Sequence, residues 1–273
     1  MRLCTYREGV GTRLGEVDGD RVWPRDGRDV GDALAGPPPR TGDALPLADI
    51  EILAPLRPPT VFGVGRNYPL HAAELRSEVP ASPQVFLKHR GSITGPAGPV
   101  VHPGAGYTAR LDYECELAVV MGRRAHRIAP EEALGHVFGY ALMADISARD
   151  LQRSEPQWLR AKGGPTFGPL GPWVTTADEV PDPQALVQRT WVNGERRQDS
   201  STAHMVFGVA SVIVFLAGSL VLEPGDVIAM GTPDGVGLGL DPPRFLVPGD
   251  RVRMMVEGLG ELDFPITEDG GLT

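Results

Sequence analysis

The sequence predicts an α+β fold that is mainly β, and three features of the chain support this prediction. The 27 prolines and 35 glycines among 273 residues imply many turns and short strands, because both residue types interrupt long helices. Short apolar runs such as 117–121 (LAVVM) are typical of strands that are buried on both faces. The glycines after Val61 lack the third glycine of a dinucleotide-binding motif, and no regular alternation of strands and helices follows them. A Rossmann fold is therefore excluded.

Composition restricts the class of protein further. Hydrophobic residues make up 41% and charged residues 22% of the chain, which are values of globular rather than disordered proteins. A net charge of -9 argues against nucleic acid as a partner, because phosphate contacts need a basic surface. Cys4 and Cys115 have no metal-ligand spacing, and the first residues lack the apolar core of a signal peptide. These features predict a reduced, cytoplasmic location.

One long apolar segment, 205–222, has about the minimum length of a membrane span. No Lys or Arg lies within it or close after it, whereas membrane spans usually carry basic flanks. Its small residues, among them Gly208 and Gly218, suggest close packing against neighbouring elements. The sequence therefore predicts a buried helix that begins near Ser201 and Thr202 and leads into a strand, and it predicts no membrane contact.

The N-terminal residues predict a small β-rich unit. Asp18–Gly19 lies between two short β-prone runs, which is typical of a tight hairpin turn. The stretch 36–39 (GPPP) is a stiff spacer, so the unit should end between Pro39 and Leu56. We assign residues 1–55 to a small N-terminal domain and residues 56–273 to the main domain.

The most informative stretch is 111–121, in which Asp112, Glu114 and Glu116 occupy alternate positions ahead of the apolar run. On one strand these three side chains would share a face, each about 6.7 Å from the next. Like charges repel one another, and burial penalises each of them. Two solutions stay open from these residues alone: the acidic half lies in water, or it binds a cation.

A second candidate group is the pair of His71 and Glu74. The residues after Asn67 predict a helix that Asn67 caps, and on that helix the two side chains would lie on one face. A carboxylate beside an imidazole fixes its tautomer and raises its basicity, which suits a general base. An ordinary exposed His–Glu pair is the alternative.

Two further groups carry charge at the ends of β-prone runs. Asp145 directly follows the apolar run 139–144, and Arg149 could neutralise it there. Residues 88–90 place three basic side chains after another such run, where they either meet an anionic ligand or form a solvated loop. The glycine-bearing stretch 235–239 looks like a phosphate cradle, but no helix signal follows, so we expect an ordinary loop.

Eight segments of the chain match one known family, in the same order. They are NYPLHAAE (67–74), FLKH (86–89), LDYECELAVVMGRRA (111–125), GYALMADISARDLQ (139–152), PLGPWVTTADEV (169–180), VNGERRQDSST (192–202), LEPGDVIAMGTPDGVG (222–237) and VEGLGELDFPI (256–266). On these segments the chain resembles the fumarylacetoacetate hydrolase family, including its acylpyruvase-like and 2-hydroxyhepta-2,4-diene-1,7-dioate isomerase-like members. The resemblance covers nearly the full length.

This resemblance implies a mixed β-sandwich roll as the catalytic domain, a small N-terminal domain, and a homodimer. It also implies one divalent cation, usually Mg2+ or Mn2+, with Ca2+ able to take its place in a crystal. The three carboxylate ligands map to Glu114, Glu116 and Asp145, and such all-oxygen donors suit hard cations. Asp112 would then be a neighbour outside the ligand set.

The resemblance also implies roles for residues of the pocket. His71 and Glu74 match a pair that activates water, on a segment that orders over bound substrate, and Lys162 matches a lysine that contacts a substrate oxygen. The implied substrate-binding residues are Thr232, Gly231, Gln152 and Lys88. The implied partner is a small anionic keto acid, with neither nucleic acid nor membrane involved.

The reaction stays open at this point. The leading hypothesis is a metal-dependent hydrolase that cleaves a C–C bond in acylpyruvates or other 1,3-diketo acids, with enolate charge stabilised by the metal. The closest alternative is an isomerase (tautomerase) of hydroxymuconate-type or hydroxyheptadienedioate-type acids, or an oxaloacetate-type decarboxylase, at the same site. A remote alternative is a non-catalytic binding homologue, which the intact His71 and Glu74 disfavour.

Two departures from the family pattern bear on the substrate. Pro165 replaces an acid soon after Lys162, and His89 with Arg90 would stand near the pocket rim. Both changes are consistent with a substrate that differs from simple acylpyruvates, and equally with neutral drift.

Overall fold

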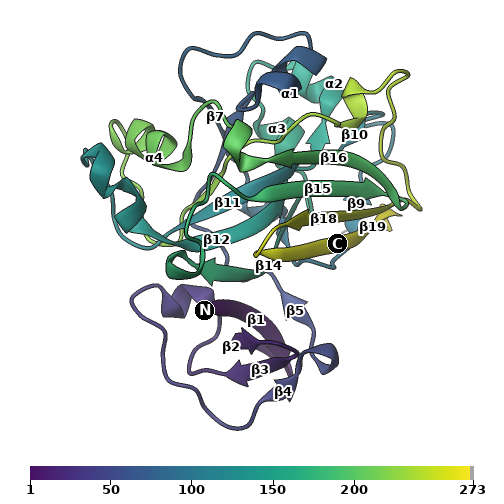
Figure 1. Cartoon of the computed structure of the whole chain (residues 1–273). Coiled ribbons are helices and arrows are strands. Elements are labelled where there is room, and N and C mark those ends of the chain that lie inside the picture. The colour runs from purple at the N-terminus through teal and green to yellow at the C-terminus, as the bar shows by residue number, and fades with distance from the viewer. Residues whose placement is uncertain (271–273) are drawn as a thin grey trace.

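The computed structural model describes residues 1–270 and confirms a mainly β fold with few helices (Figure 1). Most strands belong to one mixed sheet of twelve. In spatial order its main path is β4 (Leu45–Pro46), β3 (Arg21–Pro24), β2 (Gly11–Asp18), β1 (Arg2–Glu8), β14 (Gly168–Thr176), β12 (Val137–Ala144), β11 (Cys115–Met121), β17 (Val227–Ala229), β6 (Val61–Gly65) and β7 (Gln84–Lys88). Off this path, β5 (Ile52–Leu53) pairs with β1 and β8 (Ile93–Thr94) pairs with β14.

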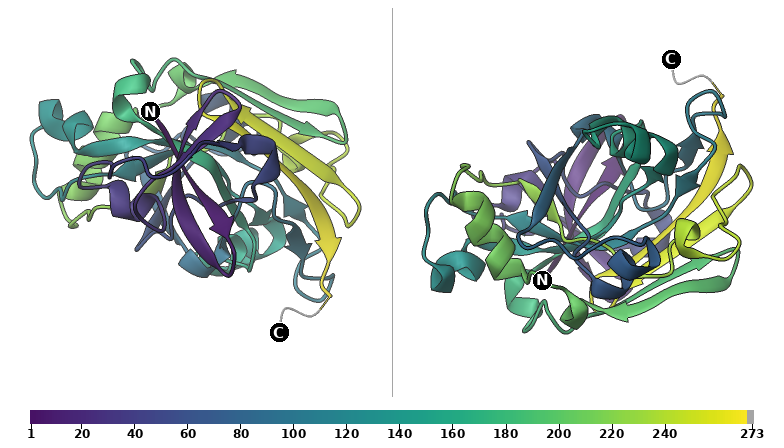
Figure 2. Two further views of the ribbon diagram at one scale, coloured as in Figure 1. Left: turned by 90° about the horizontal axis from the view of Figure 1, so that it is seen from below. Right: turned by 90° about the horizontal axis from the view of Figure 1, so that it is seen from above.

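A second sheet of five strands packs against the first. Its order is β16 (Glu195–Ser201), β15 (Val187–Val192), β18 (Arg251–Val256), β19 (Gly260–Glu268) and β9 (Val100–His102). Both views of Figure 2 show its green and yellow strands together along one flank of the molecule. A short separate ladder joins β10 (Leu111–Asp112) to β13 (Ser147–Ala148). Two sheets around a shared core agree with the β-sandwich that the family resemblance implies.

The helices are short and are mostly gathered at one end. They are α1 (Pro69–Glu74), α2 (Arg149–Ser154), α3 (Leu159–Lys162) and α4 (Val209–Ala217). Turns of 3-10 helix occur at Val30–Ala33, Leu47–Asp49, Arg90–Ser92, Pro130–His136, Ala177–Glu179, Thr202–His204 and Gly237–Gly239. Figure 1 shows α1, α2 and α3 together with β10 at the end of the molecule opposite the N-terminal strands.

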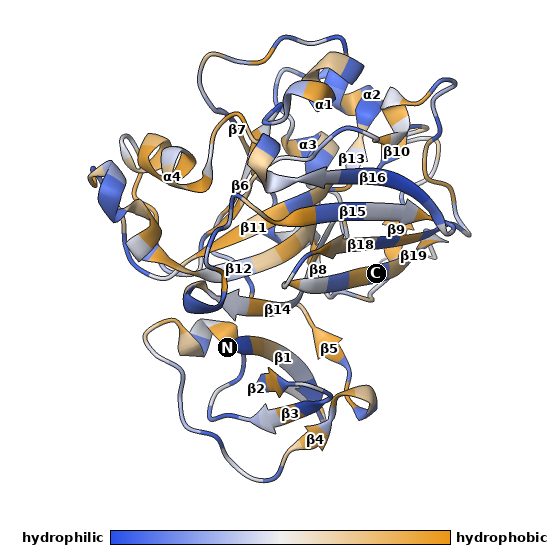
Figure 3. Cartoon of the chain, viewed as in Figure 1, coloured by the Kyte–Doolittle hydropathy of each residue, from blue (hydrophilic) through white to orange (hydrophobic). Residues whose placement is uncertain are grey.

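Strand β11 lies at the centre of the core and is buried on both faces, as its apolar run predicts. Leu117 and Val119 pack in one cluster with Val252 of the second sheet. Ala118, on the opposite face, packs in another cluster with Leu3 of β1. Figure 3 shows the corresponding apolar colouring along β11 and β12. Each Leu or Val buried in this way stabilises the fold by roughly 1.5–3 kcal/mol.

The N-terminal strands form the predicted β unit. Gly19 adopts a φ of +60° between β2 and β3, which confirms the hairpin at Asp18–Gly19. Strand β1 also pairs with β14, with Leu3 opposite Val174. Strands from before and after residue 55 therefore share one sheet, and the division into domains at that residue stays a prediction.

The apolar segment 205–222 does contain a helix, but the helix begins later than predicted. Ser201 caps only a short 3-10 turn, and α4 starts eight residues further on, at Val209. The helix buries one face, including Val212, while Phe215 on another face is 45% exposed. None of the helices within residues 1–270 is long and apolar enough to cross a membrane.

Asn67 does not cap α1, which corrects another prediction. The N-cap position is Tyr68, and the Asn67 side chain is buried. Its amide group donates to the carbonyls of Phe207 (3.0 Å) and Met230 (2.8 Å), and its oxygen accepts from the Phe207 amide (2.8 Å). Asn67 instead fastens the start of α1 to two distant segments, because their unpaired backbone groups are buried there and need partners.

The acidic stretch is not one continuous strand, contrary to prediction. Asp112 ends β10, where it pairs with Ser147, whereas β11 begins at Cys115 in the large sheet. The prediction that the three acids are evenly spaced along one strand face is therefore wrong, because the chain passes from one sheet to another between Asp112 and Cys115. All three acids are buried: Asp112 is 0%, Glu114 4% and Glu116 1% exposed. The alternative of an acidic half in water is therefore wrong.

Candidate metal centre and pocket

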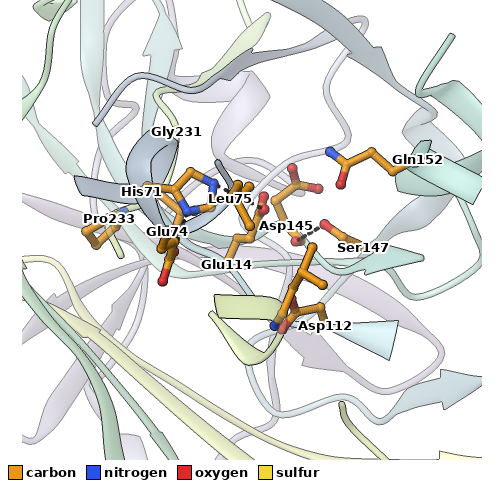
Figure 4. Close-up of polar contacts among 12 residues, drawn as sticks. His71, Glu74, Leu75, Asp112, Glu114, Asp145, Ser147, Gln152, Gly231 and Pro233 are labelled. Atoms are coloured by element: carbon orange, nitrogen blue, oxygen red, sulfur yellow. Dashed lines mark hydrogen bonds and ion pairs between the residues drawn. The ribbon is translucent and has the colours of Figure 1, made fainter. Parts of the chain in front are cut away.

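Glu114, Glu116 and Asp145 form a buried carboxylate cluster, in which oxygen atoms from all three lie within 4.8 Å of one another. The pairing of β11 with β12 creates it, since Cys115 lies opposite Ala144 and Asp145 follows directly. The Asp145 amide also donates to the Glu114 carbonyl at 2.9 Å. Figure 4 shows the side chains of Glu114 and Asp145 at the centre of the site. Residues that are distant in sequence thus meet as the family resemblance implies.

Three buried cations surround this cluster. Lys162 Nζ lies 2.5 Å from Glu114 Oε2 and 2.6 Å from Asp145 Oδ2. Lys88 Nζ donates to Asp145 Oδ1 at 2.7 Å and also to the Lys162 carbonyl. Arg149 Nη1 lies 2.6 Å from Glu114 Oε1. The prediction that Arg149 neutralises Asp145 is wrong, because the two lysines do so, and Lys88 is not part of a solvated loop.

The two glutamates of the cluster differ in their electrostatics. Burial alone would raise the pKa of Glu114, but the charges of Arg149 and Lys162 outweigh it and hold that pKa below its usual range. Burial raises the pKa of Glu116 well above its usual range, and the charges of Asp145 and Glu114 add to the rise. Among the described residues, the hydrogen-bond donor to Glu116 is the Gly231 amide, at 2.9 Å. Glu116 is therefore the least compensated acid of the cluster.

His71 and Glu74 are not an ordinary exposed pair, since His71 is only 4% exposed. His71 Nδ1 lies 2.7 Å from Glu74 Oε1, and its Nε2 lies 4.0 Å from Glu114 Oε1. Glu74 Oε2 accepts from the Gly235 amide at 2.9 Å. The imidazole thus stands between its orienting carboxylate and the carboxylate cluster (Figure 4).

A pocket of about 880 Å³ opens over these groups. The predicted site residues that line it are His71, Glu74, Glu114, Glu116, Gln152, Lys162 and Thr232. Gln152 accepts from Arg149 Nη1 at 2.9 Å, and Thr232 accepts from the Gln198 amide group at 2.8 Å. Asp145 and Gly231 lie behind the lining, where Asp145 contacts Lys162 and the Gly231 amide donates to Glu116.

Lys88 was expected in the pocket, and the structure corrects this. It does not line the pocket, because its ammonium group points to Asp145 and the Lys162 carbonyl beneath the surface. His89 and Arg90 do not line the pocket either. Their placement near its rim stays a prediction, because a rim residue need not belong to the lining.

The sequence analysis missed several residues that line the pocket. Four of them are arginines without an acidic partner among the described residues, namely Arg66, Arg76, Arg110 and Arg153. Phe86 and Trp158 add an aromatic wall, with ring centroids 5.3 Å apart, and Lys162 Nζ lies 5.1 Å from the centre of the Phe86 ring. Arg66 adjoins a segment that carries the family resemblance, and that position was the available signal. Arg110 and Arg153 adjoin such segments in the same way, whereas nothing local in the sequence marks Arg76 as a pocket residue.

A family model described as fumarylacetoacetate (FAA) hydrolase C-terminal matches residues 60–267. The chain belongs to the fumarylacetoacetate hydrolase family. A second model, Rv2993c-like, N-terminal, matches residues 1–55. The resemblance that the eight sequence segments indicated is thereby confirmed.

Relatives within this family carry different activities in their names. The oxaloacetate tautomerase YisK of Bacillus subtilis is 40% identical over 220 residues, which is 79% of this chain and 73% of that protein. The structure of 5-carboxymethyl-2-hydroxymuconate delta-isomerase from Mycobacterium smegmatis is 36% identical, with a TM-score of 0.84, over 98% of this chain and 100% of that one. Fumarylacetoacetate hydrolase (EaFAH) from Exiguobacterium antarcticum is 34% identical, with a TM-score of 0.87, over 98% and 99%.

Members of this family typically bind a divalent metal ion, and the carboxylate cluster could hold one here. Its donors are all oxygen atoms, which is the ligand type of hard cations. Each carboxylate has about four lone-pair sites, so the ion pairs with lysine and arginine leave acceptor capacity free. Among the described residues, four buried acids, counting Asp112, face three buried cations, and Glu116 is the acid that forms no ion pair; a bound cation would favour its ionised form. The residues present therefore fit such an ion.

Proposed function

We propose that the protein is a metal-dependent tautomerase (isomerase) of 2-oxo acids of the oxaloacetate or hydroxymuconate type. One observation carries the proposal: His71 is bonded to Glu74 through Nδ1 and directs Nε2 toward Glu114 of the carboxylate cluster, at 4.0 Å. A base in this position can move a proton on a substrate that is bound over the cluster. The activities named for relatives in the same family favour this function over the C–C hydrolysis that the sequence analysis placed first.

The residues of the pocket have separate tasks in this proposal. His71 Nε2 accepts a proton from the carbon beside the substrate carbonyl, and the carbonyl oxygen or a more distant carbon receives a proton in return. Glu74 accepts a hydrogen bond from Nδ1–H and so keeps Nε2 in its basic form. A divalent cation such as Mg2+ or Mn2+, held by the carboxylate cluster, would supply electrostatic stabilisation of the enolate charge. Lys162 adds a fixed positive charge on the pocket floor.

The charge of the pocket supports an anionic substrate. Six basic side chains line it, Arg66, Arg76, Arg110, Arg149, Arg153 and Lys162, against the carboxylates of Glu74, Glu114, Glu116 and Asp241. This excess is local, because the whole chain has a net charge of -9. A carboxylate substrate would be attracted to such a pocket and away from the rest of the surface. Phe86 and Trp158 offer an apolar wall for its carbon chain.

Hydrolysis of a C–C bond is the second candidate, and the same His71–Glu74 pair favours it. An imidazole that can take a proton from carbon can also take one from a water molecule. The name of the Exiguobacterium antarcticum relative is consistent with this chemistry.

The test is to follow the ultraviolet enol band of oxaloacetate and of acetylpyruvate, with and without EDTA, and to analyse the products. We expect EDTA-sensitive interconversion of keto and enol forms without stoichiometric acetate. Release of acetate and pyruvate from acetylpyruvate would identify a hydrolase instead. His71→Ala should lower kcat by about 10²–10⁴-fold, the usual contribution of a general base. His204→Ala is the matched control, because His204 contacts Ser200 outside the pocket lining.

A further inference from the structure

Asp112 is a fully buried carboxylate that does not line the pocket. Its Oδ1 accepts from the amides of Gly237 (2.7 Å) and Tyr113 (2.9 Å). Its Oδ2 accepts from the Leu238 amide (3.0 Å) and from Arg149 Nε (2.8 Å). Four donors therefore occupy this one side chain, which leaves it poorly suited to bind a metal ion and well suited to fix the groups that donate to it.

One branch of these contacts leads through the loop 235–239 to Glu74. Asp112 holds Gly237 and Leu238, and the Tyr113 hydroxyl donates to the Gly235 carbonyl at 3.0 Å. The Gly235 amide in turn donates to Glu74 Oε2. A Cβ on Gly237 would lie 2.1 Å from the Arg244 carbonyl oxygen and 2.7 Å from Asp112 Oδ1, so only glycine allows this close approach.

The other branch leads through Arg149 to Glu114. Arg149 is 3% exposed, and its Nε donates to Asp112 while its Nη1 contacts Glu114 Oε1. The two branches meet again at His71, whose Nδ1 is bonded to Glu74 and whose Nε2 faces Glu114. Asp112 thus contacts both groups that lead to the imidazole: the 235–239 loop, which bonds Glu74, and Arg149, which contacts Glu114.

We propose that Asp112 is a positioning residue that sets the place of His71 relative to the carboxylate cluster, through the 235–239 loop on one side and Arg149 on the other. The inference rests on the proposed role of His71 as the base. In Asp112→Asn an NH2 group replaces one of the two oxygens, so that at least one pair of buried donors faces another donor. The loop and Arg149 would then lose their common anchor.

A double-mutant cycle with Glu74→Gln tests this proposal. Asp112→Asn should lower kcat by roughly 10- to 100-fold, as loss of a supporting hydrogen bond does at other sites, with KM within about twofold and metal content unchanged. If Asp112 acts partly through Glu74, the double variant should be less impaired than the product of the two single losses, and the remaining loss should come from the Arg149 branch. Losses that simply multiply, or a rise in KM with kcat unchanged, would overturn the proposal.

Two further variants keep the test decisive. Asp226→Asn is the matched control, because Asp226 is also a buried acid, 2% exposed, but lies outside the pocket lining and accepts from the Glu223 amide. Asp226→Asn should change kcat little, and the loss in the double variant with Glu74→Gln should equal the product of the two single losses. If Asp112→Asn does not fold, Tyr113→Phe can replace it, because this variant removes only the hydroxyl bond to Gly235. It should give a smaller loss of kcat, and that loss should shrink when Glu74→Gln is already present.

Hydrogen exchange separates this proposal from the proposed function. Asp112→Asn should speed exchange at the amides of Gly235, Gly237 and Leu238, whatever reaction the protein catalyses. Unchanged exchange at these amides would contradict the anchoring role even in an active enzyme. Conversely, Asp112→Asn could speed exchange at these amides while His71→Ala keeps full activity. This result would support the anchoring role of Asp112 and would show that His71 is not the base.

Discussion

Two groups of buried or half-buried charges in this molecule are built differently. In the N-terminal ion-pair cluster, Glu16 Oε2 lies 2.6 Å from Arg25 Nη2 and 2.6 Å from Arg40 Nε. The hydrogen bond from Arg40, together with Arg25, outweighs burial and lowers the pKa of Glu16 to about 2. In the carboxylate cluster, burial and neighbouring acids instead raise the pKa of Glu116 well above its usual range.

The difference separates charges that serve the fold from charges that are available to a ligand. Glu16 forms ion pairs with two arginines, so its negative charge is fully compensated within the chain. Glu116 lies among acids and has one backbone amide as donor. An acid that is buried in this state is stabilised when a cation binds, which is the physical basis for assigning the metal site there.

The largest expected effect comes from Glu116→Gln. The amide is nearly the same size and can still accept from Gly231, but it is neutral and a weaker ligand. Mn2+ affinity, measured by titration calorimetry, should fall by more than about 100-fold, because even residues that only support a ligand cost about 10- to 100-fold. Glu16→Gln should bind Mn2+ as the unaltered protein does. Equal affinities for all three proteins would show that the ligand assignment is wrong.

A smaller effect is expected from Lys88→Met, which removes a buried cation from beside Asp145. Asp145 would then keep only Lys162, which it shares with Glu114. Because removal of one partner of a buried ion pair is strongly destabilising, the free energy of unfolding should fall by about 3–5 kcal/mol. The measurement is urea unfolding in EDTA, so that no metal ion replaces the lost charge. Arg40→Met, at the more exposed end of the N-terminal cluster, should cost only about 1 kcal/mol or less. Similar losses for both variants would contradict the contrast between the two clusters.

The smallest effect is expected from Glu16→Gln, and it should depend on pH. Since the folded pKa of about 2 lies below the ordinary value of 4.5, ionised Glu16 stabilises the fold at pH values above 4.5. This stabilisation, about 1 kcal/mol for such a pair, should be lost progressively as the pH falls from 4.5 toward 2. Urea unfolding at pH 7 and pH 3 should therefore show a larger difference between the variant and the unaltered protein at pH 7. A constant difference would mean that Glu16 acts through packing rather than charge.

The sequence by itself determined the mainly β fold, the family and most of the candidate site. The apolar run of β11 predicted a strand buried on both faces, and Asp18–Gly19 predicted a hairpin, because side-chain alternation and turn preferences are local properties of the chain. The family segments pointed to Glu114, Glu116 and Asp145, and the spacing of His71 and Glu74 placed them on one helix face. These features depend on residues close together in the chain or on motifs within single segments.

Only the tertiary structure decided which charges meet. Lys88 reaches Asp145 from 57 residues away, and Arg149 joins Asp112 rather than Asp145. The helix that Asn67 was expected to cap is instead held by Asn67 across the fold, through carbonyls more than a hundred residues further along the chain. Each buried polar group needs a hydrogen-bond partner, and it pairs with a donor or acceptor that the packed sheets bring close. Local sequence patterns cannot predict these partners, because the partners are far away along the chain.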